Sequence, residues 1–470
     1  MSEHKQMHIL NQRQMSWMMA TVLISGGLVS LPKILLEIGK QDSWFSQALG
    51  VGYAIFMAYF YALCAKKFPG KHLFDIVFLL CGRWFGGFLN ALHLFYLWMV
   101  LIRDTRSFAD FMNSTLLLKT PEEITFLLFI LVLMYYSKSS VEVIARVNDL
   151  MFPLFVVVLF VLPLLLTNEF SFERLEPVLG SGFAQVIESN ILPLGWFGDM
   201  IVAGAFLHTL SVSRQIRSAL TFAVSLSGVG LSLLLFMCIC VLGSTVAGRM
   251  MYPNFTLVEQ IHITDYLDRL ELVMFSVWLP SFLLKVSFLY TAFIIGLNSF
   301  TKRTKQNLYS RQLGWFLVVT TAMAFHSVVE VFDFGNFGSL FTLGFIQFPF
   351  TMFLFVLLLR SKHDEGERKT DEEIRQKERE RRDDPNTKWI DRMTGRTWFV
   401  ITLSCLGCSF VFIIVGAALG RDNAWIGATC GILYSVSMLM MMVASYLEMR
   451  QVRLTSLKPE LKQKQEQKLA

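Results

Sequence analysis

Residues 25–37, SGGLVSLPKILLE, decide the fold, because they interrupt an apolar segment that is otherwise long enough to cross a membrane. The adjacent glycines Gly26 and Gly27 weaken a helix, and Pro32 breaks one because its nitrogen carries no hydrogen. A segment that only crosses a bilayer gains nothing from these residues. The stretch therefore predicts a membrane helix that unwinds near its middle.

A second stretch, SNILPLGWFGDMIVAGAF at 189–206, has the same ingredients in Pro193, Gly195 and Gly198, followed by the acidic Asp199. One such interruption is explained as a packing point or kink, since Gly and Pro are frequent in membrane helices. Two interruptions in corresponding positions, one in the first span and one in the sixth, instead favour a binding site. They are typical of two five-helix repeats of opposite orientation, each with an unwound first helix.

Composition agrees with a membrane protein that has many spans. The chain has 470 residues, of which 54% are hydrophobic and 17% charged, and its mean hydropathy is +0.52. The first 14 residues are polar, so we expect no removable signal peptide and a first span that acts as its own insertion signal. The seven cysteines fall mostly inside apolar runs, and we interpret them as small apolar filler rather than as metal or redox groups.

Apolar windows of about 19 residues predict twelve spans. The expected spans are 15–37, 44–65, 84–103, 122–137, 147–167, 191–211, 219–246, 272–297, 313–333, 338–360, 397–419 and 424–447. The corresponding domains are an N-terminal tail (1–14), a ten-span transporter-like core (15–360), a charged linker (361–396), two additional transmembrane helices (397–447) and a basic tail (448–470). The fold class is thus an all-α polytopic membrane protein with a 5+5 inverted-repeat core and two extra helices.

The distribution of basic residues predicts cytoplasmic N- and C-termini. With the linker left out, the expected cytoplasmic segments hold 20 Lys and Arg residues and the external segments hold eight. Two external stretches, 168–189 and 247–269, are longer than simple turns, and each is expected to form a short surface helix or a lid. Lys33 is interpreted as a snorkelling charge on the outer half-helix, with a gate residue as the alternative.

One lysine inside a span requires a partner, because an unpaired charge in a bilayer is costly. Lys285 lies ten residues into the apolar part of the eighth span. Asp199 is its first candidate partner, and Glu330 and Asp333 of the ninth span are rivals. An ion pair that only fixes helix packing explains Lys285 as well as a ligand contact does.

Other polar residues near the third and eighth spans have simpler interpretations. Arg103, Asp104 and Arg106 are expected to form a snorkelling cluster at the external end of the third span. Tyr96 either lines a pocket or packs. Tyr290 lies five residues past the lysine of the eighth span, about 140° around a helix, so the two side chains need not face one cavity.

The interrupted helices predict the chemistry of the ligand. The N-terminus of a half-helix attracts a carboxylate, and its C-terminus attracts an ammonium group, so an amino-acid zwitterion suits both. No Walker motif, H-E-x-x-H or G-x-S-x-G is present, and nothing pairs a nucleophile with a base at a recognisable spacing. We therefore expect neither an enzyme nor a cofactor.

Several motifs resemble those of one family. They are IRDTRSFADFMNSTLLLKTPEEI (102–124), SSVEVIARVNDLMFPLF (139–155), LEPVLGSG (175–182), LGWFGDM (194–200) and YPNFTLVEQIHITDYLDRLELVMFSVW (252–278). Over residues 10–360 the chain resembles the B subunits of bacterial spore germinant receptors. The resemblance implies a fold like that of the amino acid–polyamine–organocation transporters, and a nutrient sensor in the spore inner membrane that acts with A-type and C-type subunits.

The resemblance also implies a site for a small germinant such as an amino acid at the broken helices. Its residues would be Gly26, Gly27, Leu28, Gly195, Gly198 and Asp199, with Tyr96, Lys285 and Tyr290 as facing positions. Asp199 stands where the family pattern has Glu, and the two extra helices extend beyond the usual ten-span chain. The alternative function is a secondary amino-acid transporter, in which Asp199, Glu330 or Lys285 would couple transport to protons or sodium; a more distant one is a scaffold with a vestigial pocket.

Overall fold

The first span is broken where its sequence predicts. The computed structural model describes residues 10–210, 212–261, 270–301, 309–361, 376, 378 and 392–456. In it, α1 (Gln12–Gly27) and α2 (Leu31–Gly39) are bent by 62° at the break. Asn11 begins α1 by accepting a hydrogen bond from the backbone N–H of Gln14. Pro32 lies in the first turn of α2, where a helix needs no backbone donor.

The rest of the described chain is also helical, and it contains no strand. In chain order the elements are η1 (Lys40–Phe45), α3 (Gln47–Lys67), α4 (Leu73–Cys81), α5 (Arg83–Thr115), α6 (Glu122–Tyr136), α7 (Val141–Leu165), η2 (Thr167–Glu169), η3 (Phe172–Leu175), α8 (Phe183–Ile191), α9 (Pro193–Phe197), η4 (Gly198–Thr209), α10 (Ser213–Leu242), α11 (Ser244–Arg249), α12 (Pro253–Glu259), α13 (Leu270–Thr301), α14 (Ser310–Ala324), α15 (Val328–Asp333), η5 (Phe334–Gly338), α16 (Ser339–Thr342), η6 (Leu343–Gln347), α17 (Phe348–Arg360), α20 (Gly395–Leu419) and α21 (Ala424–Ser456).

The sixth span is interrupted as well. A short helix, α9, begins at Pro193 and passes at Gly198 into the 3₁₀ helix η4, which is 12 residues long. Runs of 3₁₀ helix longer than three or four residues are uncommon, because their hydrogen bonds have poorer geometry than those of an α-helix. The first span contacts this region directly, since α1 packs against both α9 and η4. The two interrupted helices therefore meet inside one bundle.

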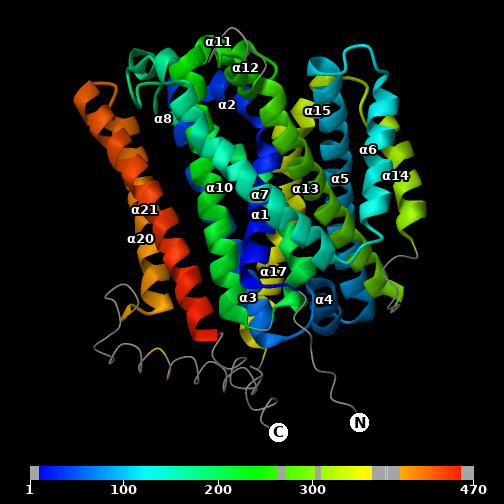
Figure 1. Cartoon of the computed structure of the whole chain (residues 1–470). Helices are drawn as coiled ribbons and strands as arrows, with labels where there is room; N and C mark the ends of the chain where they lie inside the picture. The colour runs from blue at the N-terminus through cyan, green and yellow to red at the C-terminus, as the bar shows by residue number, and fades with distance from the viewer. Residues whose placement is uncertain are drawn as a thin grey trace, which may run out of the picture.

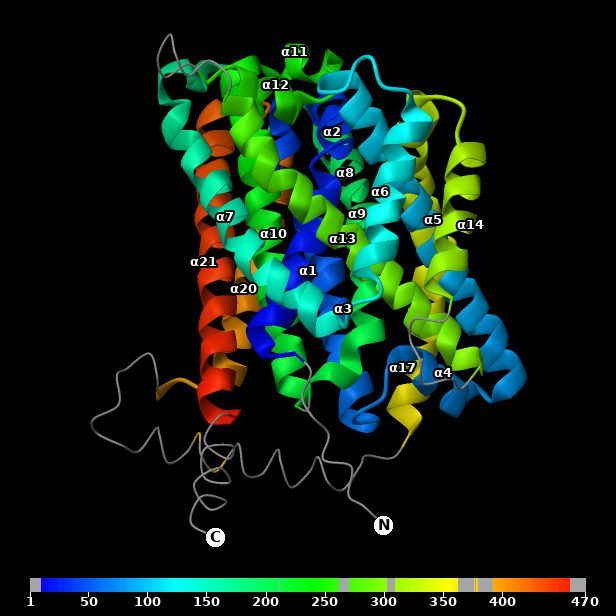
Figure 2. The same cartoon turned by 45° about the vertical axis from the view of Figure 1, so that its right-hand side comes forward.

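Nine helices in the described part of the chain are long and apolar enough to cross a membrane, and the bent α1–α2 pair makes a tenth. Two further expected spans, α6 and α14, are only 15 residues long and lie side by side at the edge of the bundle (Figure 2). The expected span 313–333 is wrong. The helix α14 ends at Ala324, Phe325 is extended, and Ser327 caps the next helix by accepting from the N–H of Glu330.

The two extra helices form an antiparallel pair against one side of the core (Figure 1). The helix α21 packs on α10, and the buried carboxylate of Glu448 pairs with Arg217 of α10 at 3.0 Å. At the other end of the pair, Gly427 lies against the backbone of Val178. Most of the predicted linker, 362–375 and 379–391, lies outside the described residues, as does 457–470, and α21 continues to Ser456, beyond the expected boundary at 447.

Both long stretches that were expected to be external contain short helices, as predicted. The helices η2 and η3 and the start of α8 occupy 168–189, and α11 and α12 occupy 244–259. Figure 1 places α11 and α12 across the end of the bundle where α2 lies, opposite to the end where α1 begins and α21 ends. The part of the second stretch at 262–269 lies outside the described residues.

Candidate functional site

Four charged side chains meet in the interior of the bundle, beside the two interrupted helices. Arg103 and Asp104 come from α5, Asp199 is the second residue of η4, and Lys285 lies midway along α13. Each of these side chains is at most 1% exposed. We call these four residues the charge cluster.

The charge cluster is closed by short contacts between every neighbouring pair of opposite charges. Arg103 reaches Asp104 Oδ1 at 2.8 Å and Asp199 Oδ2 at 2.7 Å through Nη2. Lys285 Nζ lies 2.8 Å from Asp104 Oδ2 and 2.9 Å from Asp199 Oδ2. Two positive and two negative charges balance, so the cluster is electrically neutral.

An aromatic ring and two polar side chains surround the cations of the cluster. The guanidinium of Arg103 lies 4.0 Å from the ring centroid of Trp196, and the ammonium of Lys285 lies 5.3 Å from it, so both cations face a π-system. Arg103 Nη1 also donates to Ser339 Oγ at 2.9 Å. The indole N–H of Trp196 donates to Asn336 Oδ1 at 3.3 Å. The cations are thus held by residues of α9, η5 and α16.

The glycine pair of α1 has two different roles. A Cβ atom added at Gly26 would lie 1.8 Å from Lys285 Nζ, so the ammonium occupies the space that any other residue would fill. A Cβ atom at Gly27 would meet Leu231 Cδ1 at 3.5 Å, which is an ordinary contact. Only Gly26 is therefore required by the charge cluster.

The glycines of the second interrupted helix allow close approach to α16 and η6. A Cβ at Gly195 would lie 2.9 Å from the backbone nitrogen of Leu340. A Cβ at Gly198 would lie 2.9 Å from both Tyr96 Oη and Gln347 Oε1, and Gln347 Nε2 donates to the carbonyl of Gly198 at 3.0 Å. Tyr96 is buried beside this glycine, and its hydroxyl has no hydrogen-bond partner among the described residues.

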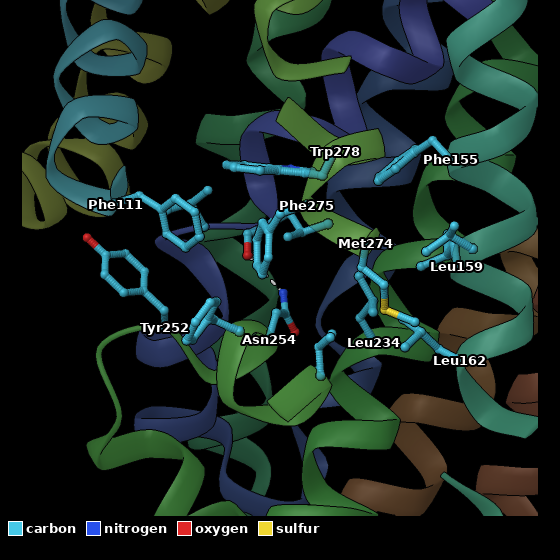
Figure 3. A pocket seen from close by; sticks show the side chains of 15 residues that line it. Phe111, Phe155, Leu159, Leu162, Leu234, Tyr252, Asn254, Met274, Phe275 and Trp278 are labelled. Atoms are coloured by element: carbon cyan, nitrogen blue, oxygen red, sulfur yellow. Dashed lines mark hydrogen bonds between the residues drawn. The ribbon is translucent and has the colours of Figure 1, made fainter. Parts of the chain in front are cut away.

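An apolar cavity of about 60 Å³ adjoins the break in the first span. Leu28 and residues of α5, α7, α10, α12 and α13 line it, and Figure 3 shows Phe111, Tyr252, Phe275 and Trp278 around one part of it. The amide of Asn254 donates to the carbonyl of Leu28 at 2.8 Å, which satisfies one backbone group freed by the break. The helix α12 therefore closes the break from outside.

Sequence reasoning misplaced Arg103 and Asp104, which were expected at the membrane interface. They are buried because α5 is 33 residues long and continues to Thr115, well past the predicted end of the third span. Arg106, from the same predicted cluster, is also buried and pairs with Asp110 at 3.3 Å. The sequence does indicate that this helix is long, since it has no helix breaker between residue 103 and Pro121.

Lys285 has two partners: Asp199, the first of the three candidates, and Asp104, which was not among them. Glu330 and Asp333 are wrong as partners, because they belong to α15. Glu330 accepts from the backbone N–H of His326 at 2.8 Å, and its side chain is 51% exposed. The structure also separates Tyr290 from the charge cluster, because its buried hydroxyl donates to the carbonyl of Ser310 at the start of α14.

The charge cluster has the chemistry to exchange partners with a zwitterion. Burying charges in a low-dielectric interior costs several kcal/mol per ion, and apolar residues of similar volume often give equal or greater stability. Stability alone therefore does not account for four charges here. Asp199 Oδ2 accepts from both cations, whereas its Oδ1 has no hydrogen-bond partner within the described chain. A carboxylate could replace an aspartate on the cations, and an ammonium could replace a cation on the aspartates.

Comparison with known proteins gives one matching family model, described as "Spore germination protein", over residues 9–329. Among curated relatives, the putative spore germination protein YfkT of Bacillus subtilis (strain 168) is 25% identical over 67% of this chain and 87% of its own length. Spore germination protein KB of the same organism is 20% identical over 69% of this chain and 89% of its own.

Solved structures with a similar course of the chain are those of membrane transporters. A Na⁺-coupled sialic acid symporter gives a TM-score of 0.49 at 11% identity, over 92% of this chain and 89% of its own. A manganese transporter of Eremococcus coleocola gives 0.46 at 15% identity, over 96% and 97%.

Proposed function

The chain belongs to the spore germination protein family, and from this premise we propose that it is a germinant-receptor subunit. It binds a small nutrient, for which we choose an amino acid, at the two interrupted helices. Binding changes the conformation of the bundle, and that change is passed to A-type and C-type partner subunits. The protein resides in the spore inner membrane with both termini in the cytoplasm, and it is not an enzyme and needs no cofactor.

The observation that carries this proposal is the charge cluster of Arg103, Asp104, Asp199 and Lys285. It joins two long helices, α5 and α13, to the interrupted η4, and the ammonium of Lys285 also packs on Gly26 at the end of α1. A ligand that enters this cluster acts on both interrupted helices at once. Membrane-embedded charges of this kind are functional sites by default.

The amino acid acts by exchanging ion pairs. Its carboxylate takes the place of Asp199 on Arg103 or Lys285, and its ammonium pairs with the released aspartate. Because Asp199 lies on η4, its release frees that segment to move against α5 and α13. A ligand shifts such an equilibrium only by its differential affinity for the two conformations, and a swap of ion pairs supplies that difference.

A secondary transporter is the second candidate, because Lys285 and Asp199 are buried ionisable groups beside an interrupted helix. Such groups mark ion and proton pathways in membrane proteins. In that function the lysine or the aspartate would change its charge during each cycle and so couple amino-acid movement to protons or sodium. Glu330, which was also a coupling candidate, is exposed and paired with His326.

Two measurements separate these functions. The first measurement is the fall in optical density when nutrient is added to spores. We expect spores that carry Gly26→Ala to show no such fall, while spores with Gly27→Ala respond like the wild type. Uptake of labelled amino acids into proteoliposomes of the purified protein tests transport. Saturable uptake would contradict the pure receptor, and an unchanged dose–response of the Gly26→Ala spores would remove the charge cluster from the mechanism.

A further inference from the structure

A second group of ionisable side chains lies near the end of α5, where the chain turns into α6. Arg106 and Asp110 are about one helical turn apart on α5, and Arg106 Nε lies 3.3 Å from Asp110 Oδ1. The same guanidinium contacts Oε1 of Glu122, the first residue of α6, through Nη2. Thr125 of α6 ties the two helix ends together by donating to Asn113 Oδ1 at 2.7 Å. One guanidinium therefore serves two carboxylates, and we call Asp110 and Glu122 the carboxyl pair.

The charges at the carboxyl pair do not balance. Two carboxylates and one guanidinium leave a net charge of −1, whereas the charge cluster has as many cations as carboxylates. The side chain of Asp110 is 1% exposed, and neither of its oxygens has a hydrogen-bond donor within the described chain. Its carboxyl group also lies within hydrogen-bonding reach of that of Glu122. Two ionised carboxylates in contact repel each other and neither can donate, whereas a proton on one of them turns the contact into a hydrogen bond.

The elements around the carboxyl pair supply no second cation. Neither carboxylate forms an ion pair with any described residue other than Arg106. Lys119, in the turn between α5 and α6, is exposed, and Lys33 of α2 lies over the ring of Phe332 at 5.8 Å. The helices that pack against α5 add only carboxylates at this end, namely Glu123 of α6, Glu271 of α13, and Glu330 and Asp333 of α15. Their negative charge favours a proton on the pair.

Tyr252 connects the carboxyl pair to the break in the first span. Its ring packs edge-on against Phe111, with ring centroids 5.0 Å apart, and Figure 3 shows its hydroxyl directed away from the apolar cavity. The hydroxyl lies near Ser114 and both carboxylates, and it makes no well-aligned hydrogen bond within the described chain. Burial raises the pKa of Tyr252 and the two carboxylates raise it further, so the hydroxyl keeps its proton. Tyr252 directly precedes α12, whose Asn254 closes the break by donating to the carbonyl of Leu28.

We propose that Asp110 and Glu122 bind one proton between them at neutral pH, and that this proton keeps α12 closed over the break. With the proton bound, the carboxyl pair carries a single negative charge, which Arg106 neutralises. Without it, a second negative charge is buried at the end of α5, and an uncompensated buried charge is costly. That charge favours conformations in which water reaches Asp110, and Tyr252 at the start of α12 is among the side chains packed there. The proton thus acts on the broken helix from a site separate from the charge cluster.

Infrared spectroscopy of the purified full-length protein in detergent tests the proton directly. An un-ionised carboxyl group has a C=O band that an ionised carboxylate lacks, and the band shifts in D₂O. We expect this band in the wild type at neutral pH. Asp110→Asn and Glu122→Gln each lose the intensity of one carboxyl group, because Arg106 neutralises the carboxylate that remains. The matched control is Glu142→Gln, which removes an exposed carboxylate paired with Arg146 one helical turn away and keeps the wild-type band.

The pH dependence of stability counts the same proton. Asp and Glu in an unfolded chain titrate near pH 4, so at neutral pH the unfolded chain binds no proton at these two residues and the folded chain binds one. Unfolding therefore releases a proton, and stability falls as the pH rises. Between about pH 6 and about pH 7 we expect the unfolding constant of the wild type to rise about tenfold more than that of Asp110→Asn or Glu122→Gln. The second variant, at a partly exposed position, keeps the test available if the first does not fold.

Hydrogen–deuterium exchange of the α12 backbone tests the link to the break. We expect exchange, corrected for its intrinsic pH dependence, to increase at alkaline pH in the wild type and not in Glu122→Gln; equal exchange in the two would overturn the link. A carboxyl band that persists in both variants, or a pH dependence equal to theirs in the wild type, would overturn the proton site. Stability that rises with Na⁺ concentration at constant ionic strength, without the carboxyl band, would also overturn it and would identify a bound metal cation.

Discussion

Replacement of Gly26 by alanine is the sharpest perturbation of the charge cluster, because it changes one methyl group and no charge. The added Cβ would lie 1.8 Å from Lys285 Nζ. Ordinary van der Waals contact requires about 3.5 Å, so the ammonium must retreat by about 1.7 Å. The lysine side chain is flexible, but it is fully buried and held by two carboxylates. Its retreat therefore displaces the ammonium from its place in both ion pairs.

The magnitude follows from the two distances. At an effective dielectric constant of about 20, lengthening a pair from 2.9 Å to about 4.6 Å loses about 2 kcal/mol, so the two pairs of Lys285 together lose at most about 4 kcal/mol. The higher helix propensity of alanine stabilises the folded state by up to about 1 kcal/mol and so offsets part of this loss. The net destabilisation expected for Gly26→Ala therefore reaches at most about 3 kcal/mol. Gly27→Ala meets only an ordinary contact with Leu231 and is expected to be neutral or slightly stabilised.

Equilibrium unfolding of the purified protein in mixed micelles measures both variants. A double-mutant cycle with Lys285→Met isolates the cause, since the penalty of Gly26→Ala disappears when the ammonium is absent. If Gly26→Ala costs as much in the Lys285→Met background as in the wild type, the penalty comes from the helix and not from the ion pairs. An equal loss of unfolding free energy in Gly27→Ala would likewise show that the contact with Lys285 is not the cause.

Two further predictions concern residues outside the charge cluster. Gly427→Ala would bring a Cβ within 2.1 Å of the backbone oxygen of Val178, which cannot move aside as a side chain can, so we expect the helix pair to loosen and the apparent Tm to fall. The control Gly407→Ala, whose Cβ would meet no atom within 4 Å, leaves the apparent Tm unchanged, and equal Tm values for the two variants would contradict this prediction. Burial lowers the pKa of His72, the residue that caps α4, to about 4. Because the unfolded chain binds more protons than the folded one between pH 6.5 and about 4, the free energy of unfolding falls as the pH falls through this window. His72→Asn keeps a capping side chain and is expected to reduce this pH dependence. A pH dependence identical to that of the wild type would show that His72 is not its source.

The positions of the two breaks could be predicted from sequence because they depend on local backbone chemistry. Pro32 and Pro193 remove backbone donors, and Gly26 and Gly198 allow close packing, whatever surrounds them. Each proline acts within one or two turns of its own helix, and each glycine weakens its own helix by its low helix propensity. The paired interruption in the first and sixth spans was therefore predictable without a structure.

The composition of the charge cluster could be predicted only in part. Lys285 and Asp199 were recognisable because each stands alone in an apolar stretch. Arg103 and Asp104 were assigned to the interface because a window of about 19 residues ends there, whereas α5 spans about 50 Å. How a helix is tilted and how far it extends depend on its neighbours, which the sequence of one helix does not contain. Glu330 was misassigned for a similar reason, since three non-helical residues, 325–327, separate two helices that look continuous in the sequence.

The central claim is that an amino acid binds at the charge cluster, and a thermal-shift screen of the purified protein with the twenty L-amino acids tests it most directly. A ligand at 100 times its Kd stabilises the folded state by about 2.7 kcal/mol, which moves the apparent Tm by several degrees. We expect at least one amino acid to raise the apparent Tm of the wild type and of Asp42→Asn, which changes a buried carboxylate outside the cluster, but not that of Asp199→Asn. The claim would be contradicted if no amino acid raised the apparent Tm of the wild type, or if the apparent Tm of Asp199→Asn rose by the same amount.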